Sequence, residues 1–283
     1  MKSSPIKKQK ESPKYGDIFR IGDRGLLACG DARDEALIKK MVGDKKIAAV
    51  IVDVPYGIKA VESKEGFGKI TVQKKILNDD IDTDASYTTF TEAWIKPLLP
   101  HLTKKNSFYI FNADPMVFAL RQGMLNAGLT FSQLLIWAKT GATLTRKDYA
   151  VQHELIAVGW FGAHAFRAAK DRSVLVYPKP ARSPLHASQK PVGLIRRLIL
   201  NATNPNDIVC DPFAGSGTLG VAAFETQRSF ILIERDEAYV QTIIDRAGGG
   251  RVGCVRAQFH QLRHAHHRGL DRTSGARYPS SRA

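Results

Sequence analysis

The chain alternates short apolar runs with segments of helical periodicity, and this alternation constrains its fold more than any other feature. Runs rich in β-branched and other apolar residues that end at polar positions, as strands do, occur at residues 47–57, 106–113, 131–140, 206–213 and 229–234. Segments with helical spacing occur at residues 36–42, 87–102, 115–128, 190–203, 217–227 and 235–247. The pattern predicts an α/β fold, a doubly wound and mostly parallel sheet with helices on both faces.

Composition separates a central domain from two basic ends. Residues 1–15 are rich in Lys, Ser and Pro and predict a flexible arm, whereas residues 16–247 predict one domain. Residues 248–283 are rich in Arg and His with little apolar periodicity, so we expect a disordered tail. Within the domain, residues 141–185 interleave basic and aromatic side chains. This small insertion is a candidate DNA-contact region, with an ordinary solvated insertion as the alternative.

The charge balance favours a polyanionic partner. The chain has 42 Lys and Arg against 27 Asp and Glu, a formal net charge of +15, which suits nucleic acid or an acidic membrane surface. No stretch is long and apolar enough to span a bilayer, and the N-terminus has no apolar segment of the signal-peptide kind. Cys29, Cys210 and Cys254 are widely separated and form no metal spacing and no disulfide framework. We therefore expect a cytoplasmic protein without a bound metal.

A glycine-rich turn in the stretch DPFAGSG, residues 211–217, lies between a predicted strand and a predicted helix. Gly215 and Gly217 allow a ligand to approach the backbone, next to the unpaired N–H groups of a helix start. Glu234 ends the next strand, where an acid can accept hydrogen bonds from both hydroxyls of a ribose. Neither the G-x-G-x-x-G fingerprint nor the P-loop pattern is present. These features together predict a nucleoside site.

Several ordered motifs resemble those of one family. DPFAGSG and DVPYG, residues 53–57, are similar to the two signature motifs of S-adenosylmethionine-dependent DNA amino-methyltransferases, in the permuted order of the β group. Further resemblance lies in LLACGDARD, in LIWAKT with QHELIAVG, and in HASQKPVGLIRRLI, so that residues 18–245 are covered. The resemblance implies a Rossmann-like domain and S-adenosylmethionine as cofactor.

The resemblance also assigns a role to the end of the strand VIVDVPYG, residues 50–57. An exocyclic base amine is a poor nucleophile because its lone pair is delocalised into the ring. By resemblance, Asp53 accepts a hydrogen bond from the amine, Pro55 stiffens the loop, and Tyr56 stacks on the flipped-out base. Val54 departs from the usual proline at its position, although the acid, the next proline and the aromatic residue remain.

The remaining site residues are carried over in the same way. Residues expected around the cofactor are Asp31 at its adenine, Phe213, Gly215 and Gly217 at the methionine and ribose, Glu234 on the ribose hydroxyls, Asp211 near the glycine turn or the methionine ammonium, and Lys190 at the methionine end. Candidate DNA phosphate contacts are Arg146, Lys147 and Arg172. The pair His153 and Glu154 matches a family pair that we interpret as structural.

The predicted function is therefore methyl transfer from S-adenosylmethionine to adenine N6 in double-stranded DNA, by direct displacement after base flipping. An acid at the first position of DVPYG favours adenine, since serine is commoner among the N4-cytosine enzymes of the family. Two alternatives stay open: an N4-cytosine DNA or an RNA methyltransferase, and a catalytically inactive DNA-binding relative. A separate restriction endonuclease is a further candidate partner.

Overall fold

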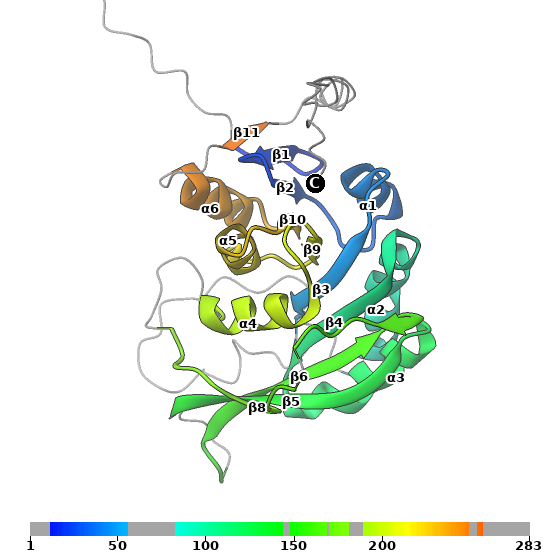
Figure 1. Cartoon of the computed structure of the whole chain (residues 1–283), viewed down its shortest axis with the longest axis vertical. Coiled ribbons are helices and arrows are strands. Elements are labelled where there is room, and N and C mark those ends of the chain that lie inside the picture. The colour runs from blue at the N-terminus through cyan, green and yellow to red at the C-terminus, as the bar shows by residue number, and fades with distance from the viewer. Residues whose placement is uncertain are drawn as a thin grey trace, which may run out of the picture.

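A computed structural model describes residues 12–55, 83–143, 148–168, 170–180, 189–248 and 254–256. These residues form one extended sheet flanked by helices, as Figure 1 shows. Its strands are β1 (Ile18–Ile21), β2 (Gly25–Cys29), β3 (Ile47–Asp53), β4 (Leu102–Asn112), β5 (Thr130–Thr143), β6 (Val151–Trp160), β7 (Ala163–His164), β8 (Val174–Val176), β9 (Ile208–Asp211), β10 (Ser229–Glu234) and β11 (Cys254–Arg256). The helices are α1 (Glu35–Val42), α2 (Asp84–Ile95), α3 (Val117–Asn126), α4 (Val192–Ala202), α5 (Thr218–Glu225) and α6 (Glu237–Gly248).

The centre of the sheet is parallel, which confirms the predicted fold class. The strand order is β11-β1-β2-β10-β9-β3-β4-β6-β5-β8, with β7 beside β4. Parallel pairing joins the five central strands, β2, β10, β9, β3 and β4. Antiparallel pairing joins β1 to β11 and β2, and joins β6 to β4 and β5. Helical crossovers return the chain to the same edge between parallel strands, so their carboxyl ends lie together.

Helices cover both faces because successive strand residues point to opposite sides. Val50 and Val52 of β3 belong to the core beneath α1, α2 and α3. Ala49 and Ile51 belong to the core beneath α4, α5 and α6. The two helix groups lie on opposite sides of the sheet in Figure 1. This burial on both faces explains why β3 is a continuous apolar run rather than an alternating one.

Beyond β4, the strands of the sheet no longer alternate with helices along the chain. β5 and β6 form an antiparallel ribbon that is paired from Thr130 with Trp160 to Thr143 with Val151. Leu135 is level with Asp53 through Ile156 and Phe111, so β5 runs eight positions beyond that level, from 136 to 143. The ribbon therefore extends past the carboxyl edge of the central strands.

A short strand lies within the range predicted as a disordered tail. Cys254–Arg256 form β11 and pair with β1, so these three residues depart from the disorder expected for 248–283.

Within the ranges that the structure describes, no helix is both long and apolar enough to cross a membrane.

Helix α4 offers a matched test of the core. Leu198 is fully buried against the sheet, whereas Leu200 is 47% exposed on the same helix. We expect Leu198→Ala to lower the free energy of unfolding by about 2–5 kcal/mol, because it leaves a cavity. Leu200→Ala should change it by about 0.5 kcal/mol or less. Urea unfolding followed by circular dichroism measures both, and equal effects would contradict this assignment of the buried face.

Candidate active site

Three carboxyl groups end neighbouring parallel strands at one edge of the sheet. Asp53 ends β3, Asp211 ends β9 and Glu234 ends β10. The two-residue strand period places them in step with Ile51, Val209 and Leu232, on the face covered by α4, α5 and α6. Burial raises the pKa of Asp211 well above its ordinary value, and the nearby carboxylates of Asp53 and Glu234 raise it further. The three acids therefore share one electrostatic environment.

The glycine turn between β9 and α5 wraps around these acids. The amide of Phe213 donates to Asp211 Oδ1 at 3.0 Å, and the amide of Gly215 donates to Glu234 Oε2 at 2.7 Å. Gly215 and Gly217 have φ of +52° and +77°. A Cβ at Gly217 would also lie 3.0 Å from Ile243 Cγ1, so this position requires glycine on two grounds.

Glu234 is held by backbone donors on both carboxylate oxygens. Besides Gly215, the amide of Asp236 donates to Oε1 at 2.8 Å. Burial raises the pKa of Glu234 to about 7, even though these backbone hydrogen bonds favour the charged form. Glu234 is thus a half-buried acid that changes charge near neutral pH.

Asp31 reaches the same edge but is bound to arginine. The amide of Gly30 donates to the carbonyl of Glu234 at 2.9 Å, which places the loop after β2 beside β10. The Arg33 guanidinium forms a bidentate pair with Asp31, Nε to Oδ1 at 2.9 Å and Nη2 to Oδ2 at 2.7 Å. The side-chain hydrogen bond from Arg33 holds the pKa of Asp31 below its ordinary value.

Phe213 lies at the glycine turn as a half-buried ring. Its centroid is 5.7 Å from that of Phe90 and 5.8 Å from that of Trp94, both on α2. These contacts link the glycine turn to the helices on the opposite side of the sheet from α5.

Lys190 is the residue for which sequence and structure differ most. Lys190 is not a solvated surface lysine, because it is 5% exposed. Its Nζ lies 2.6 Å from Asp53 Oδ2 and 3.0 Å from Glu154 Oε2. Glu154 Oε1 in turn lies 2.8 Å from Nζ of Lys139. The lysine expected at the methionine end of a cofactor therefore contacts the proposed catalytic acid directly.

The sequence analysis did not select Lys139 and interpreted Glu154 as structural, although the sequence carried a signal that both contact charged partners. Lys139 follows Leu135 and Trp137 at the two-residue period of a buried strand face. Glu154 shares its face of β6 with Ile156 and Val158. A charged residue in step with buried apolar neighbours needs a partner, and the partner of each lies on the neighbouring strand.

The other predicted residues are only partly placed. Pro55 is half-buried directly after β3 and the buried Val54. Tyr56, Arg146 and Lys147 lie outside the described residues. Arg172 is exposed, and its amide donates to Asp171 Oδ1 at 2.7 Å.

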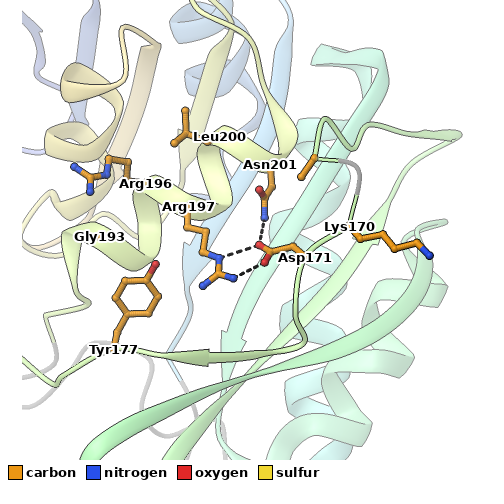
Figure 2. A pocket seen from close by; sticks show the side chains of 9 residues that line it. Lys170, Asp171, Tyr177, Gly193, Arg196, Arg197, Leu200 and Asn201 are labelled. Atoms are coloured by element: carbon orange, nitrogen blue, oxygen red, sulfur yellow. Dashed lines mark hydrogen bonds and ion pairs between the residues drawn. The ribbon is translucent and has the colours of Figure 1, made fainter.

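A depression of about 410 Å³ lies beside α4, and Figure 2 shows the side chains that line it. Asp171 accepts hydrogen bonds there from the guanidinium of Arg197 and from Asn201 Nδ2, the latter at 2.6 Å. Tyr177 packs against Gly193, where a Cβ would meet its ring at 3.2 Å. None of the predicted site residues that the structure describes lines this depression. Its contacts fasten α4, which begins two residues after Lys190, to the chain around β8.

The arrangement as a whole combines negative charge, a close-approach turn and two buried cations, Lys190 and Lys139. Asp53 is partly accessible, with 25% of its side chain exposed, whereas Asp211 is only 8% exposed. A cationic ligand at the glycine turn would offset the charge of Asp211 and Glu234. Asp53 would then face a second reactant at the strand end.

Comparison with known proteins identifies the family. Residues 47–245 match the DNA methylase model of N6 and N4 methyltransferases, which is well over half of the chain. Type II methyltransferase M1.MboII of Moraxella bovis is 23% identical over 268 residues, covering 79% of this chain and 95% of that protein. Type II methyltransferase M.HinfI of Haemophilus influenzae is 25% identical over 232 residues, covering 71% of this chain and 63% of the relative.

Solved structures agree with this. The crystal structure of the M1.HpyAVI–SAM complex is 25% identical, with a TM-score of 0.57, and the match covers 78% of this chain and 98% of that one. The cytosine-N4-specific PvuII DNA methyltransferase is 16% identical with a TM-score of 0.60, covering 85% and 96%, and so supports the fold alone. The chain therefore belongs to the N6 and N4 DNA methylase family and is a DNA methyltransferase whose cofactor is S-adenosylmethionine.

Proposed function

We propose that the protein methylates adenine N6 in double-stranded DNA and that Asp53 is its catalytic carboxylate. The observation that carries this proposal is the partly exposed Asp53 carboxylate at the strand end, beside the acids of the glycine turn. An acid at this position is the feature of DVPYG that favours adenine over cytosine. The nitrogen attacks the methyl carbon directly, so that an N–C bond forms while the S–C bond breaks and the amine releases a proton.

The charges of the site fit the cofactor. S-adenosylmethionine carries a sulfonium and an ammonium group, and the buried Asp211 and the half-buried Glu234 supply negative charge at the glycine turn. We assign Glu234 to the ribose hydroxyls and Asp211 to the turn and the methionine ammonium. Gly215 and Gly217 give close backbone approach, and Phe213 lines the methionine and ribose portion. When bound, the cofactor supplies an electrophilic methyl group.

Asp31 and Lys190 border this cofactor region in different ways. We assign Asp31 to the adenine end, where it acts together with Arg33, because both its oxygens accept hydrogen bonds from that guanidinium. We assign Lys190 to the methionine end, where its contacts with Asp53 and Glu154 would put its charge near the reacting amine.

The catalytic step follows from what the strand end can offer. Asp53 accepts a hydrogen bond from the exocyclic amine, which opposes delocalisation of the nitrogen lone pair and stabilises the positive charge that develops. Pro55 limits the freedom of the loop, so that a neighbouring backbone carbonyl accepts a hydrogen bond from the second N–H of the amine. Tyr56 is proposed to stack on the flipped base, as the DVPYG resemblance implies.

DNA is proposed to lie along the carboxyl edge, next to the β5–β6 ribbon. The ribbon passes the level of Asp53, and Arg146 and Lys147 belong to the segment that connects its strands. Together with Arg172 they are proposed to bind backbone phosphates, in keeping with the net charge of +15. Since both relatives are named type II methyltransferases, a separate restriction endonuclease is also a proposed partner.

The first prediction concerns Asp53. With tritiated S-adenosylmethionine and unmethylated genomic DNA, we expect label in N6-methyladenine after digestion to nucleosides. Asp53→Ala should lower the rate by about a hundredfold or more, because the amine loses its acceptor. Asp23→Ala, at an acid with 79% of its side chain exposed, is the control and should retain full activity.

The outcomes of this assay separate the alternatives. Label in N4-methylcytosine would replace adenine by cytosine as the target base. Label in no base, despite measurable cofactor binding, would contradict the catalytic reading and favour an RNA substrate or a DNA-binding role. Equal rates for Asp53→Ala and wild type would remove Asp53 from the mechanism.

The second prediction concerns pH. The pKa of Glu234 is about 7 in the folded protein, so Glu234 becomes protonated as pH falls through neutrality. A protonated carboxyl accepts hydrogen bonds from the ribose less well, and affinity for S-adenosylmethionine should fall by about tenfold from about pH 8 to about pH 6. Glu234→Gln should bind more weakly at about pH 8 and show a flatter profile, with Asp211 supplying the remaining dependence. Calorimetric titration at each pH measures this, and parallel profiles for the two proteins would argue against the role of Glu234.

A further inference from the structure

Four charged side chains form a continuous row behind the proposed catalytic acid. The row runs from Lys139 on β5 through Glu154 on β6 and Lys190 before α4 to Asp53 on β3. Its three contacts are 2.8 Å, 3.0 Å and 2.6 Å between nitrogen and oxygen atoms. Glu154 is the centre of the row, since each of its oxygens contacts a different lysine.

The two lysines of the row are shielded from solvent and lie near aromatic rings. The side chains of Lys139 and Lys190 are both 6% exposed, and that of Glu154 is 19% exposed. The ammonium of Lys190 lies 5.3 Å from the ring centroid of Phe111, and that of Lys139 lies 5.2 Å from the ring centroid of Trp137. Removing such charges from water is costly, and apolar residues of similar volume often stabilise a fold at least as well. Stability alone is therefore a weak reason for this row.

Electrostatics favour the charged forms of Glu154 and Lys190. Burial alone would raise the pKa of Glu154, but the ammonium groups of Lys190 and Lys139 outweigh it and hold the pKa at about 2. Burial alone would lower the pKa of Lys190, but Asp53 and Glu154 outweigh it and raise the pKa above its ordinary value. Asp211 on β9 also interacts with both Lys190 and Asp53. Asp211 is thus a second carboxylate that attracts the Lys190 ammonium. The contact with Glu154 draws this ammonium toward β6, where it also contacts Asp53.

We propose that Glu154 and Lys139 are positioning residues for methyl transfer: Lys139 fixes Glu154, Glu154 fixes the ammonium of Lys190, and Lys190 fixes the carboxylate of Asp53. Neither Glu154 nor Lys139 touches the base in this arrangement. The inference rests on the proposed role of Asp53. It goes beyond that role by assigning a function in the reaction to two residues on the β5–β6 ribbon.

The kinetic test uses Glu154→Gln, which keeps the shape and removes the charge, and Lys139→Met. We expect each to lower kcat by about tenfold to a hundredfold, because a small displacement of Asp53 disturbs the reacting geometry. KM for DNA and the affinity for S-adenosylmethionine should stay near the wild-type values. Lys139→Arg should restore most of kcat. Glu92→Gln, which breaks the exposed pair with Lys96 on α2, is the control and should leave kcat unchanged.

A double-mutant cycle tests whether the row acts as a unit. If Lys139 acts only through Glu154, the variant with both substitutions should lose no more activity than Glu154→Gln alone. If the fold-losses in kcat of the two single variants multiply in the double variant, Lys139 does not act through Glu154, and the proposal is overturned. A purely structural role would instead lower the melting temperature in step with activity and leave kcat per folded molecule unchanged, which would also overturn the proposal.

A crystal structure of Glu154→Gln provides a readout that does not depend on activity. We expect the Lys190 ammonium to leave Asp53 Oδ2, and a retained contact of 2.6 Å would overturn the inference. If wild-type protein methylates no base, the proposed function fails, while the crystallographic result still decides whether Glu154 positions Lys190.

Discussion

Parallel pairing of β9 with β3 on one side and β10 on the other is the constraint on which the site depends. It brings Asp53, Asp211 and Glu234 to one edge, although more than 150 residues separate the first from the other two. The shared strand period then turns all three toward the face covered by α4, α5 and α6. A different pairing order would leave the same residues without a common site.

Concentrating carboxylates at one edge has an electrostatic consequence. Asp211 and Glu234 both have raised pKa values because they are buried, and Asp211 is raised further by the neighbouring carboxylates. Lys190 offsets part of this charge from the side of Asp53. The glycine-turn half of the edge thus remains suited to a cationic cofactor, while the β3 half has its own balancing cation. This division matches the two reactants of methyl transfer.

The β5–β6 ribbon extends past the edge that carries Asp53, and its strand β6 lies within residues 141–185, the range predicted as an insertion. The inner face of the ribbon begins as ordinary core at Leu135 and Ile156, level with Asp53, and becomes charged at Glu154 and Lys139, beyond that level. Helix α4 is held separately, by hydrogen bonds that its residues Arg197 and Asn201 donate to Asp171 (Figure 2). Lys190 is therefore held between a ribbon and a helix that are each anchored independently.

The sequence by itself determined the α/β class, the order of strands and helices along most of the chain, the glycine turn and the acids that end three strands. These are local signals, set by side-chain periodicity and by the backbone freedom of glycine. Only the tertiary structure decided which strands are neighbours, that β5 and β6 are an antiparallel ribbon, and that Lys190 contacts Asp53 rather than solvent. The partners of Lys190 come from β3 and β6, and sequence spacing carries no information about distances between such separate segments. Contacts between buried charges therefore had to come from the packed fold, where desolvation makes each one require a partner.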